Sequence, residues 1–276
     1  MSVIAIIGAG PLGGALAQKL AERSRAREVR LIDPEESVAK GKALDILQSG
    51  PVDGFSATLN AHGSINAAVG ADVIVLADSV AGDEHAGETG LALVRQLHAA
   101  GASSPIVFAG GSQRELMMRC VRELHLPSGR LVGSAPAALA SALRALCAVV
   151  IDTSAVEISL PVVGVPPDGA VVAWEEASAA GEPLTAMMAA HEIAGITARI
   201  PGLWPPGPYA LASAAARVAE AVCAGSRRRY SCFVDLGRGR IAAMPVELRR
   251  GGIKKIVEPT LSPLERTGLE NAIDER

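Results

Sequence analysis

Three glycines near the start of the chain and one later aspartate have the types and spacing needed to hold a dinucleotide. Gly8, Gly10 and Gly13 form a G-x-G-x-x-G loop directly after an apolar run at residues 3–7. The first glycine of such a loop permits a tight turn, the second lets the backbone approach a pyrophosphate, and the third lets the next helix pack on the strand. Asp33 follows at the sequence separation that such sites require of their acid. A carboxylate there accepts hydrogen bonds from the ribose hydroxyls and repels a 2′-phosphate. The pattern therefore predicts an NAD site rather than an NADP site.

The segments around this loop have the order that a dinucleotide site requires. Residues 3–7 predict a buried strand, residues 15–22 have helical periodicity, and residues 29–32 predict a second strand that ends at the acid. The amino terminus of the helix offers unpaired N–H groups and a partial positive charge to phosphates. A glycine-rich structural turn is the alternative. The predicted cofactor-binding residues are Gly8, Gly10, Pro11, Leu12, Gly13 and Asp33.

Composition and charge argue against several other classes of protein. The chain has 276 residues, a formal net charge of -3 and 3% aromatic residues, which gives no case for nucleic-acid or anionic-membrane binding. Its apolar runs are too short to span a bilayer. Four cysteines without C-x-x-C spacing, and an amino terminus without the features of a signal peptide, favour a cytoplasmic protein with reduced thiols. No cluster of histidine, cysteine and acidic residues has metal-ligand spacing.

The rest of the sequence predicts two parts of different character. Short β-branched runs alternate with helical segments in the first part, at residues 56–61, 72–77, 105–109 and 131–133. This alternation is typical of a doubly wound parallel sheet. The second part has strand-like runs at 156–164, 170–174, 231–236 and 241–247, an alanine-rich helix over 208–224 and a terminal helix near 262. We predict an α/β fold with a Rossmann-type NAD-binding domain (1–134) and an α+β substrate domain (135–276).

In this order of segments the sequence resembles the malate and lactate dehydrogenase family, and more closely its malate branch. Residues 8–33 have the family's spacing without gaps, and residues 41–52 resemble its helix after the second strand. Residues 209–213 resemble the helix beside the substrate, and residues 244–256 resemble the C-terminal hairpin. The resemblance implies an NAD-dependent 2-hydroxyacid oxidoreductase. It also implies a homodimer or homotetramer, assembled through the helix at 41–49 and the long second-domain helix.

The catalytic residues of that family do not carry over. Its members remove the hydroxyl proton with a histidine, orient that histidine with an aspartate, and clamp substrate carboxylates with arginines. The gapless match places Pro166 at the histidine, and it places Leu139 and Ala142 at the two positions that hold the third arginine and the orienting aspartate. Arg144 is about 200° around the helix from Ala142. The loop at 78–88 is short and contains no arginine, and Gly110-Gly111 stands where the family has Asn-Pro.

The shortened loop contains the residues that remain of chemical interest. His85 follows Asp83 and Glu84, and a histidine beside carboxylates can act as an acid or base. His85 is therefore the one candidate catalytic residue, with a plain surface histidine as the alternative. Asp78 stands where the family has a small neutral residue, and its charge opposes pyrophosphate binding unless it is neutralised or turned away. Asp168 keeps the acid of the histidine loop, although a Pro-Pro-Asp-Gly turn explains it equally well.

Two functions remain open at this level. The first is a divergent NAD-binding member of the dehydrogenase family whose turnover of malate and lactate is weak or absent. The second is a non-catalytic nucleotide-binding protein, or a structural or regulatory homo-oligomer, on the same fold. The sequence names no substrate beyond the 2-hydroxy and 2-oxo acids that the resemblance implies.

Overall fold

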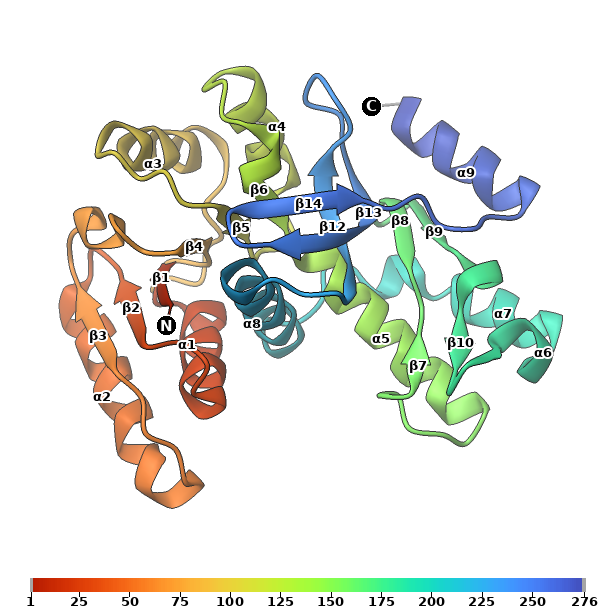
Figure 1. The fold of residues 1–276 in the computed structure, drawn as a ribbon, viewed down its shortest axis with the longest axis horizontal. Helices are drawn as coiled ribbons and strands as arrows, with labels where there is room; N and C mark the ends of the chain where they lie inside the picture. The colour runs from red at the N-terminus through yellow and green to blue at the C-terminus, as the bar shows by residue number, and fades with distance from the viewer. Residues whose placement is uncertain (1, 275–276) are drawn as a thin grey trace.

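The computed structural model describes residues 2–274, and its first half is a parallel sheet covered by helices (Figure 1). The strands are β1 (Val3–Ile7), β2 (Glu28–Ile32), β3 (Leu59–His62), β4 (Val73–Leu76), β5 (Ile106–Phe108) and β6 (Leu131–Gly133). The helices are α1 (Pro11–Arg23), α2 (Glu36–Asp53), α3 (Gly87–Ala99) and α4 (Arg114–Arg122). The strand order β3-β2-β1-β4-β5-β6 is that of a doubly wound dinucleotide-binding sheet, which confirms the predicted fold class.

The second half adds α+β structure that extends the same sheet. Its helices are α5 (Ala135–Val150), α6 (Leu184–Met187), α7 (Ala190–Thr197), α8 (Pro208–Ala224) and α9 (Pro263–Asp274). Its strands are β7 (Ile158–Ser159), β8 (Val162–Val165), β9 (Gly169–Val172), β10 (Ser178–Ala179), β11 (Glu182–Pro183), β12 (Arg229–Asp235), β13 (Ile241–Arg249) and β14 (Gly252–Ile256). Strands β12, β13, β8 and β9 continue the sheet beyond β6, β14 pairs with β13, and β7, β10 and β11 form a separate small sheet.

The two halves join where β6 pairs with β12. Gly133 lies opposite Phe233 in this antiparallel pair, and a Cβ atom at Gly133 would lie 2.7 Å from the Cβ of Phe233. A glycine is therefore required at this point, because any side chain would push the strands apart. The predicted boundary after residue 134 falls between β6 and α5, while the sheet itself runs through both halves (Figure 1).

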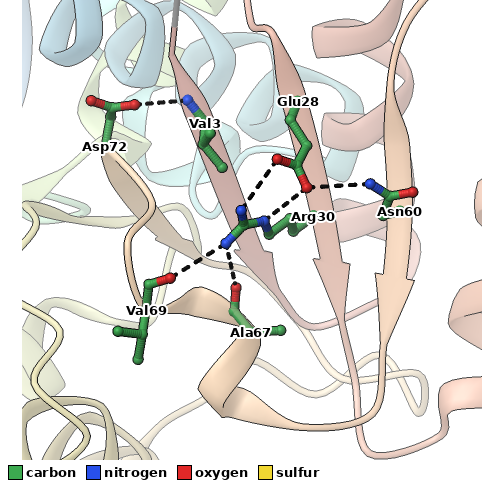
Figure 2. Close-up of polar contacts among 7 residues, drawn as sticks. All are labelled: Val3, Glu28, Arg30, Asn60, Ala67, Val69 and Asp72. Atoms are coloured by element: carbon green, nitrogen blue, oxygen red, sulfur yellow. Dashed lines mark hydrogen bonds and ion pairs between the residues drawn. The ribbon is translucent and has the colours of Figure 1, made fainter.

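The amino-terminal end of the parallel sheet is held by half-buried polar groups. The Asp72 carboxylate accepts a hydrogen bond from the Val3 amide at 2.8 Å, which ties the start of β4 to the start of β1 (Figure 2). Arg30 on β2 donates to both carboxylate oxygens of Glu28 and to the Ala67 carbonyl (Figure 2). The hydrogen bond from Arg30 lowers the pKa of Glu28. These contacts fix the strand ends that lie opposite the glycine loop.

The carboxyl ends of the strands bring together the residues from which a site is built. Strands β1 and β4 are buried along their whole length and pair in register, Ile7 opposite Leu76. The glycine loop after β1 and the loop after β4 therefore leave the sheet at the same edge. Strand β5 pairs with β4 and carries Gly110 to that edge as well. Open α/β sheets bind their ligands at this carboxyl edge.

None of the helices within residues 2–274 is both long and apolar enough to cross a membrane. The four cysteines are free and buried, and burial raises the pKa of their thiols.

Candidate functional site

The glycine loop has the geometry that its sequence predicts. Gly8 has a φ of +106°, a conformation that side chains other than glycine rarely adopt. A Cβ at Gly13 would lie 2.0 Å from the Gly8 carbonyl oxygen, so α1 approaches the strand more closely than alanine would permit. Pro11 is the first residue of α1 and Gly10 is its N-cap, with no side-chain cap. The first amides of this helix therefore point beyond the carboxyl ends of the strands.

The carboxylate of Asp78 lies at the amino terminus of α1 and accepts hydrogen bonds from two of these amides. The Gly13 amide donates to Oδ1 at 2.8 Å and the Leu12 amide donates to Oδ2 at 3.0 Å. The Gly10 amide donates to the Asp78 carbonyl at 3.0 Å. Asp78 is 4% exposed. A carboxylate in this position is stabilised by charge-assisted hydrogen bonds and by the positive end of the helix dipole.

Asp33, the predicted ribose acceptor, is also engaged by the backbone. Its carboxylate accepts hydrogen bonds from the Ala9 amide at 2.9 Å and the Glu35 amide at 3.0 Å, and the residue is 3% exposed. Lys42 on α2 donates from Nζ to the Ala9 carbonyl at 2.5 Å. The glycine loop is thus fixed from both sides by groups that a dinucleotide would approach.

The loop between β4 and α3 folds over this edge as a small hairpin. Asp78 and Glu84 form an isolated antiparallel bridge, and the Ser79 amide donates to the Asp83 carbonyl at 2.9 Å. Glu84 then reaches the loop after β5. Its carboxylate accepts hydrogen bonds from the Gly111 and Ser112 amides, both at 2.8 Å. A second internal carboxylate therefore binds backbone amides at the same sheet edge.

His85 lies inside this arrangement. Its ring interacts electrostatically with the carboxylates of Asp33 and Asp78. Burial lowers the pKa of His85, and the two carboxylates act in the opposite direction. Its Nε2 atom is buried without a hydrogen-bond partner in the part of the chain that the structure describes. The candidate base therefore lies over the glycine loop, among the ends of β1, β2 and β4.

The positions that match the family's catalytic residues hold groups without acid–base function. Leu139 on α5 is fully buried in an apolar cluster, and Pro166 at the end of β8 is buried as well. Arg144, also on α5, donates to the Ile158 carbonyl at 3.4 Å. Asp168 is exposed in the turn between β8 and β9.

Three residues of the site were not singled out from the sequence as binding groups. Glu84 and Lys42 contact the loops described above. Gln113 is 0% exposed; its Oε1 accepts from the Gly110 amide at 3.0 Å, and its Nε2 donates to the Ala77 carbonyl at 3.2 Å. Only Lys42 stood in a segment with a recognisable pattern. Among residues 2–274, no group of histidine, cysteine and acidic side chains is arranged to hold a metal ion.

The fold and the glycine loop define a Rossmann-type dinucleotide-binding protein with an α+β extension, and comparison with known proteins narrows this class. Residues 2–99 match the family model for the NAD binding domain of lactate/malate dehydrogenase. A malate dehydrogenase from Thermomicrobium roseum is 29% identical over 292 residues, and one from Chlorobium phaeobacteroides is 26% identical over 295 residues. Each alignment covers 98% of this chain and 94% of the relative.

Solved structures agree in fold. The malate dehydrogenase from Salinibacter ruber superposes with a TM-score of 0.88 at 22% identity, over 99% of this chain and 94% of that one. The lactate dehydrogenase from Cryptosporidium parvum gives 0.87 at 22% identity, over 99% and 95%. Residues 2–99 therefore belong to the NAD-binding part of the lactate/malate dehydrogenases, the chain as a whole is similar to these enzymes in sequence and fold, and the match implies NAD as the cofactor.

In the conformation of the structure, the residues present do not fit the pyrophosphate of that cofactor. A pyrophosphate on a G-x-G-x-x-G loop binds the amides at the amino terminus of the following helix. Here the Leu12 and Gly13 amides are already bonded to Asp78. The space beside Gly10 is also filled, because a Cβ there would lie 2.2 Å from the Ser79 carbonyl oxygen and 2.5 Å from the Asp78 Cγ. We therefore derive no hydride-transfer step from this geometry.

Proposed function

We propose that this chain is an NAD-binding member of the dehydrogenase family whose turnover of malate and lactate is weak or absent. The observation that carries the proposal is the buried Pro166 at the position of the family's histidine. A proline ring bonded into the peptide chain has no nitrogen that accepts a proton. Removal of the general base alone lowers such rates by about 10² to 10⁴-fold.

The loss of the anion clamp supports the same proposal. Leu139 and Ala142 stand at the positions matched to the family's third arginine and orienting aspartate, and Leu139 is 0% exposed among apolar side chains. Residues 78–88 contain no arginine. A 2-oxo acid carboxylate that enters this cleft therefore lacks the planar, bidentate donor that would hold it in place. Poor positioning adds to the loss of the base, because a misplaced substrate reacts more slowly.

The contacts proposed for NAD remain those predicted from the sequence. They belong to a proposed NAD-binding domain at 1–134, followed by an α+β domain at 135–276. The turn at Gly8 and the close packing at Gly13 support a role in the cradle. The proposed contacts are Gly8, Gly10, Pro11, Leu12, Gly13 and Asp33.

The decisive experiment is oxaloacetate- and pyruvate-dependent oxidation of NADH by the purified protein. The Salinibacter ruber malate dehydrogenase, assayed in parallel with oxaloacetate, serves as the positive control. We expect kcat/KM for both acids to be at least about 10⁴-fold below that control, from loss of the base and the clamp together. A value within tenfold of the control would refute the proposal.

His85 is the proposed base for any residual turnover. Its position over the glycine loop, beside two carboxylates, supports a proton-transfer role. The variant His85→Gln should then abolish the residual rate, whereas His98→Gln on the outer helix α3 should leave it unchanged. A residual rate that survives His85→Gln would assign the proton transfer to another group.

Exposed apolar side chains favour the second function, a homo-oligomer. Leu44 and Val52 on α2 are 56% and 85% exposed, which is costly for a helix that faces only water. We propose a homodimer or homotetramer that buries this face. Sedimentation should show a species larger than the monomer for the wild type and for Leu264→Glu on the distant α9. Leu44→Glu should shift it toward monomer; a monomeric wild type would refute this assembly.

The buried, free cysteines support a cytoplasmic location.

A further inference from the structure

The loop at residues 78–86 behaves like a ligand of the glycine loop. Its first residue places a carboxylate on the amino terminus of α1, and Glu84 places another on the Gly111 and Ser112 amides. Both carboxylates use both of their oxygens. The amides that they bind belong to the first turn of α1 and to the loop after β5, and both lie beside the carboxyl end of β4. A family cofactor would cross this same edge.

The chemistry of Asp78 matches that of a phosphate at this point. A phosphate oxygen on a helix amino terminus accepts N–H hydrogen bonds and is stabilised by the helix dipole. Asp78 supplies one negative charge and two acceptor oxygens, at 2.8 Å and 3.0 Å from amide nitrogens. At 4% exposure it is shielded from water. While Asp78 is bonded to these amides, a pyrophosphate cannot bind them, and the negative charge of Asp78 repels it.

In this conformation, residues 78–86 fill the space that a bound cofactor would need. The space that the lack of a side chain leaves at Gly10 is filled by the chain itself. A Cβ there would lie 2.2 Å from the Ser79 carbonyl oxygen. At Gly110 the same space is taken by Glu84, whose Oε2 would lie 2.2 Å from a Cβ.

We propose that residues 78–86 close the dinucleotide site from within, with Asp78 as an internal substitute for the cofactor's pyrophosphate. NAD then binds only to the fraction of molecules in which Asp78 has left the helix. This inference goes beyond the proposed loss of turnover, because it concerns binding and names the group that opposes it. If the closed form makes up about 99% of the protein, the apparent affinity falls about 100-fold.

The test is calorimetric titration of the full chain with NADH, and separately with inorganic pyrophosphate. Asp78→Ala removes the charge and frees the two amides, while Asp78→Asn keeps the size and removes the charge. Asp72→Ala is the matched control: it removes a carboxylate that also accepts a backbone amide at 2.8 Å, but at the opposite end of β4. Circular dichroism establishes that each variant is folded.

We expect Asp78→Ala to bind NADH at least about 100-fold more tightly than the wild type and to gain pyrophosphate binding. Asp78→Asn should fall between them, and Asp72→Ala should match the wild type. NADH should raise the melting temperature of Asp78→Ala but not that of the wild type. Equal NADH affinity in the wild type and Asp78→Ala overturns the proposal. Failure of every folded variant to bind also overturns it, since Asp78 would then not be what excludes the cofactor. The oxaloacetate assay is read separately and does not affect this result.

Discussion

Replacement of Asp78 by alanine should change the stability of the free protein, and the size of the change follows from its contacts. The carboxylate accepts two buried amide hydrogen bonds at the start of α1. Hydrogen bonds to charged groups contribute about 1.5–3 kcal/mol each. The cost of dehydrating a carboxylate at 4% exposure offsets part of this gain. Loss of a helix N-cap group costs about 0.5–2 kcal/mol, so we expect a net loss near 2–3 kcal/mol.

A loss of that size is readily measured by thermal unfolding at pH 7 without ligand. For a chain of this length about 1 kcal/mol corresponds to roughly 2–4 °C, so Asp78→Ala should melt roughly 5–10 °C below the wild type. Asp72→Ala loses one hydrogen bond from a half-buried carboxylate and should lose roughly 3 °C. An Asp78→Ala protein that melts at or above the wild type would refute this reasoning. The carboxylate would then cost more in dehydration than its hydrogen bonds return.

Three further predictions concern other parts of the molecule. Gly13→Ala should lower the melting temperature by more than 10 °C, because its Cβ would meet a backbone carbonyl at 2.0 Å; Gly14→Ala on the same helix meets only the end of a lysine at 3.6 Å and should gain up to about 1 kcal/mol. Equal effects of the two would contradict the predicted close approach of α1. Glu220→Gln should cost about 3 kcal/mol in urea unfolding, because the buried carboxylate lies 3.2 Å from Arg23 Nε and joins α8 to α1; a cost below about 0.5 kcal/mol would show that the pair is not coupled. His85 has a lowered pKa, so between its folded pKa and the ordinary value of 6.5 the unfolded chain binds more protons. Stability should fall as pH drops below about 6.5, and His85→Gln should remove that part of the fall; an unchanged pH profile would argue against a buried, neutral ring.

Much of the fold could be predicted because its signals are local. The predicted helix over 208–224 coincides with α8, and the runs at 72–77, 105–109 and 131–133 contain β4, β5 and β6. Continuous β-branched runs suit strands buried on both faces, and the glycines fix the turn between β1 and α1. The two-residue strands β10 and β11 carry weaker local patterns and take their structure from the strands with which they pair.

The occupant of the site could not be predicted in the same way. The sequence marks Asp78 as a charge that opposes a pyrophosphate, but its two hydrogen bonds join residues 65 and 66 positions apart. Glu84 reaches its partners across 27 and 28 positions, and no local pattern distinguishes it from a solvated loop acid. Which way such side chains turn depends on the paired ends of β1, β4 and β5.

The sequence alone predicts that this chain builds a cradle for a dinucleotide, and it predicts the loss of the family's histidine and arginines. Backbone demands explain the cradle, since only glycine permits the turn at position 8 and the packing at position 13. The tertiary structure alone decides what lies in the cradle. The parallel sheet sets the end of β4 beside the amino terminus of α1, and the unpaired amides there bind the nearest anion, which is the chain's own Asp78.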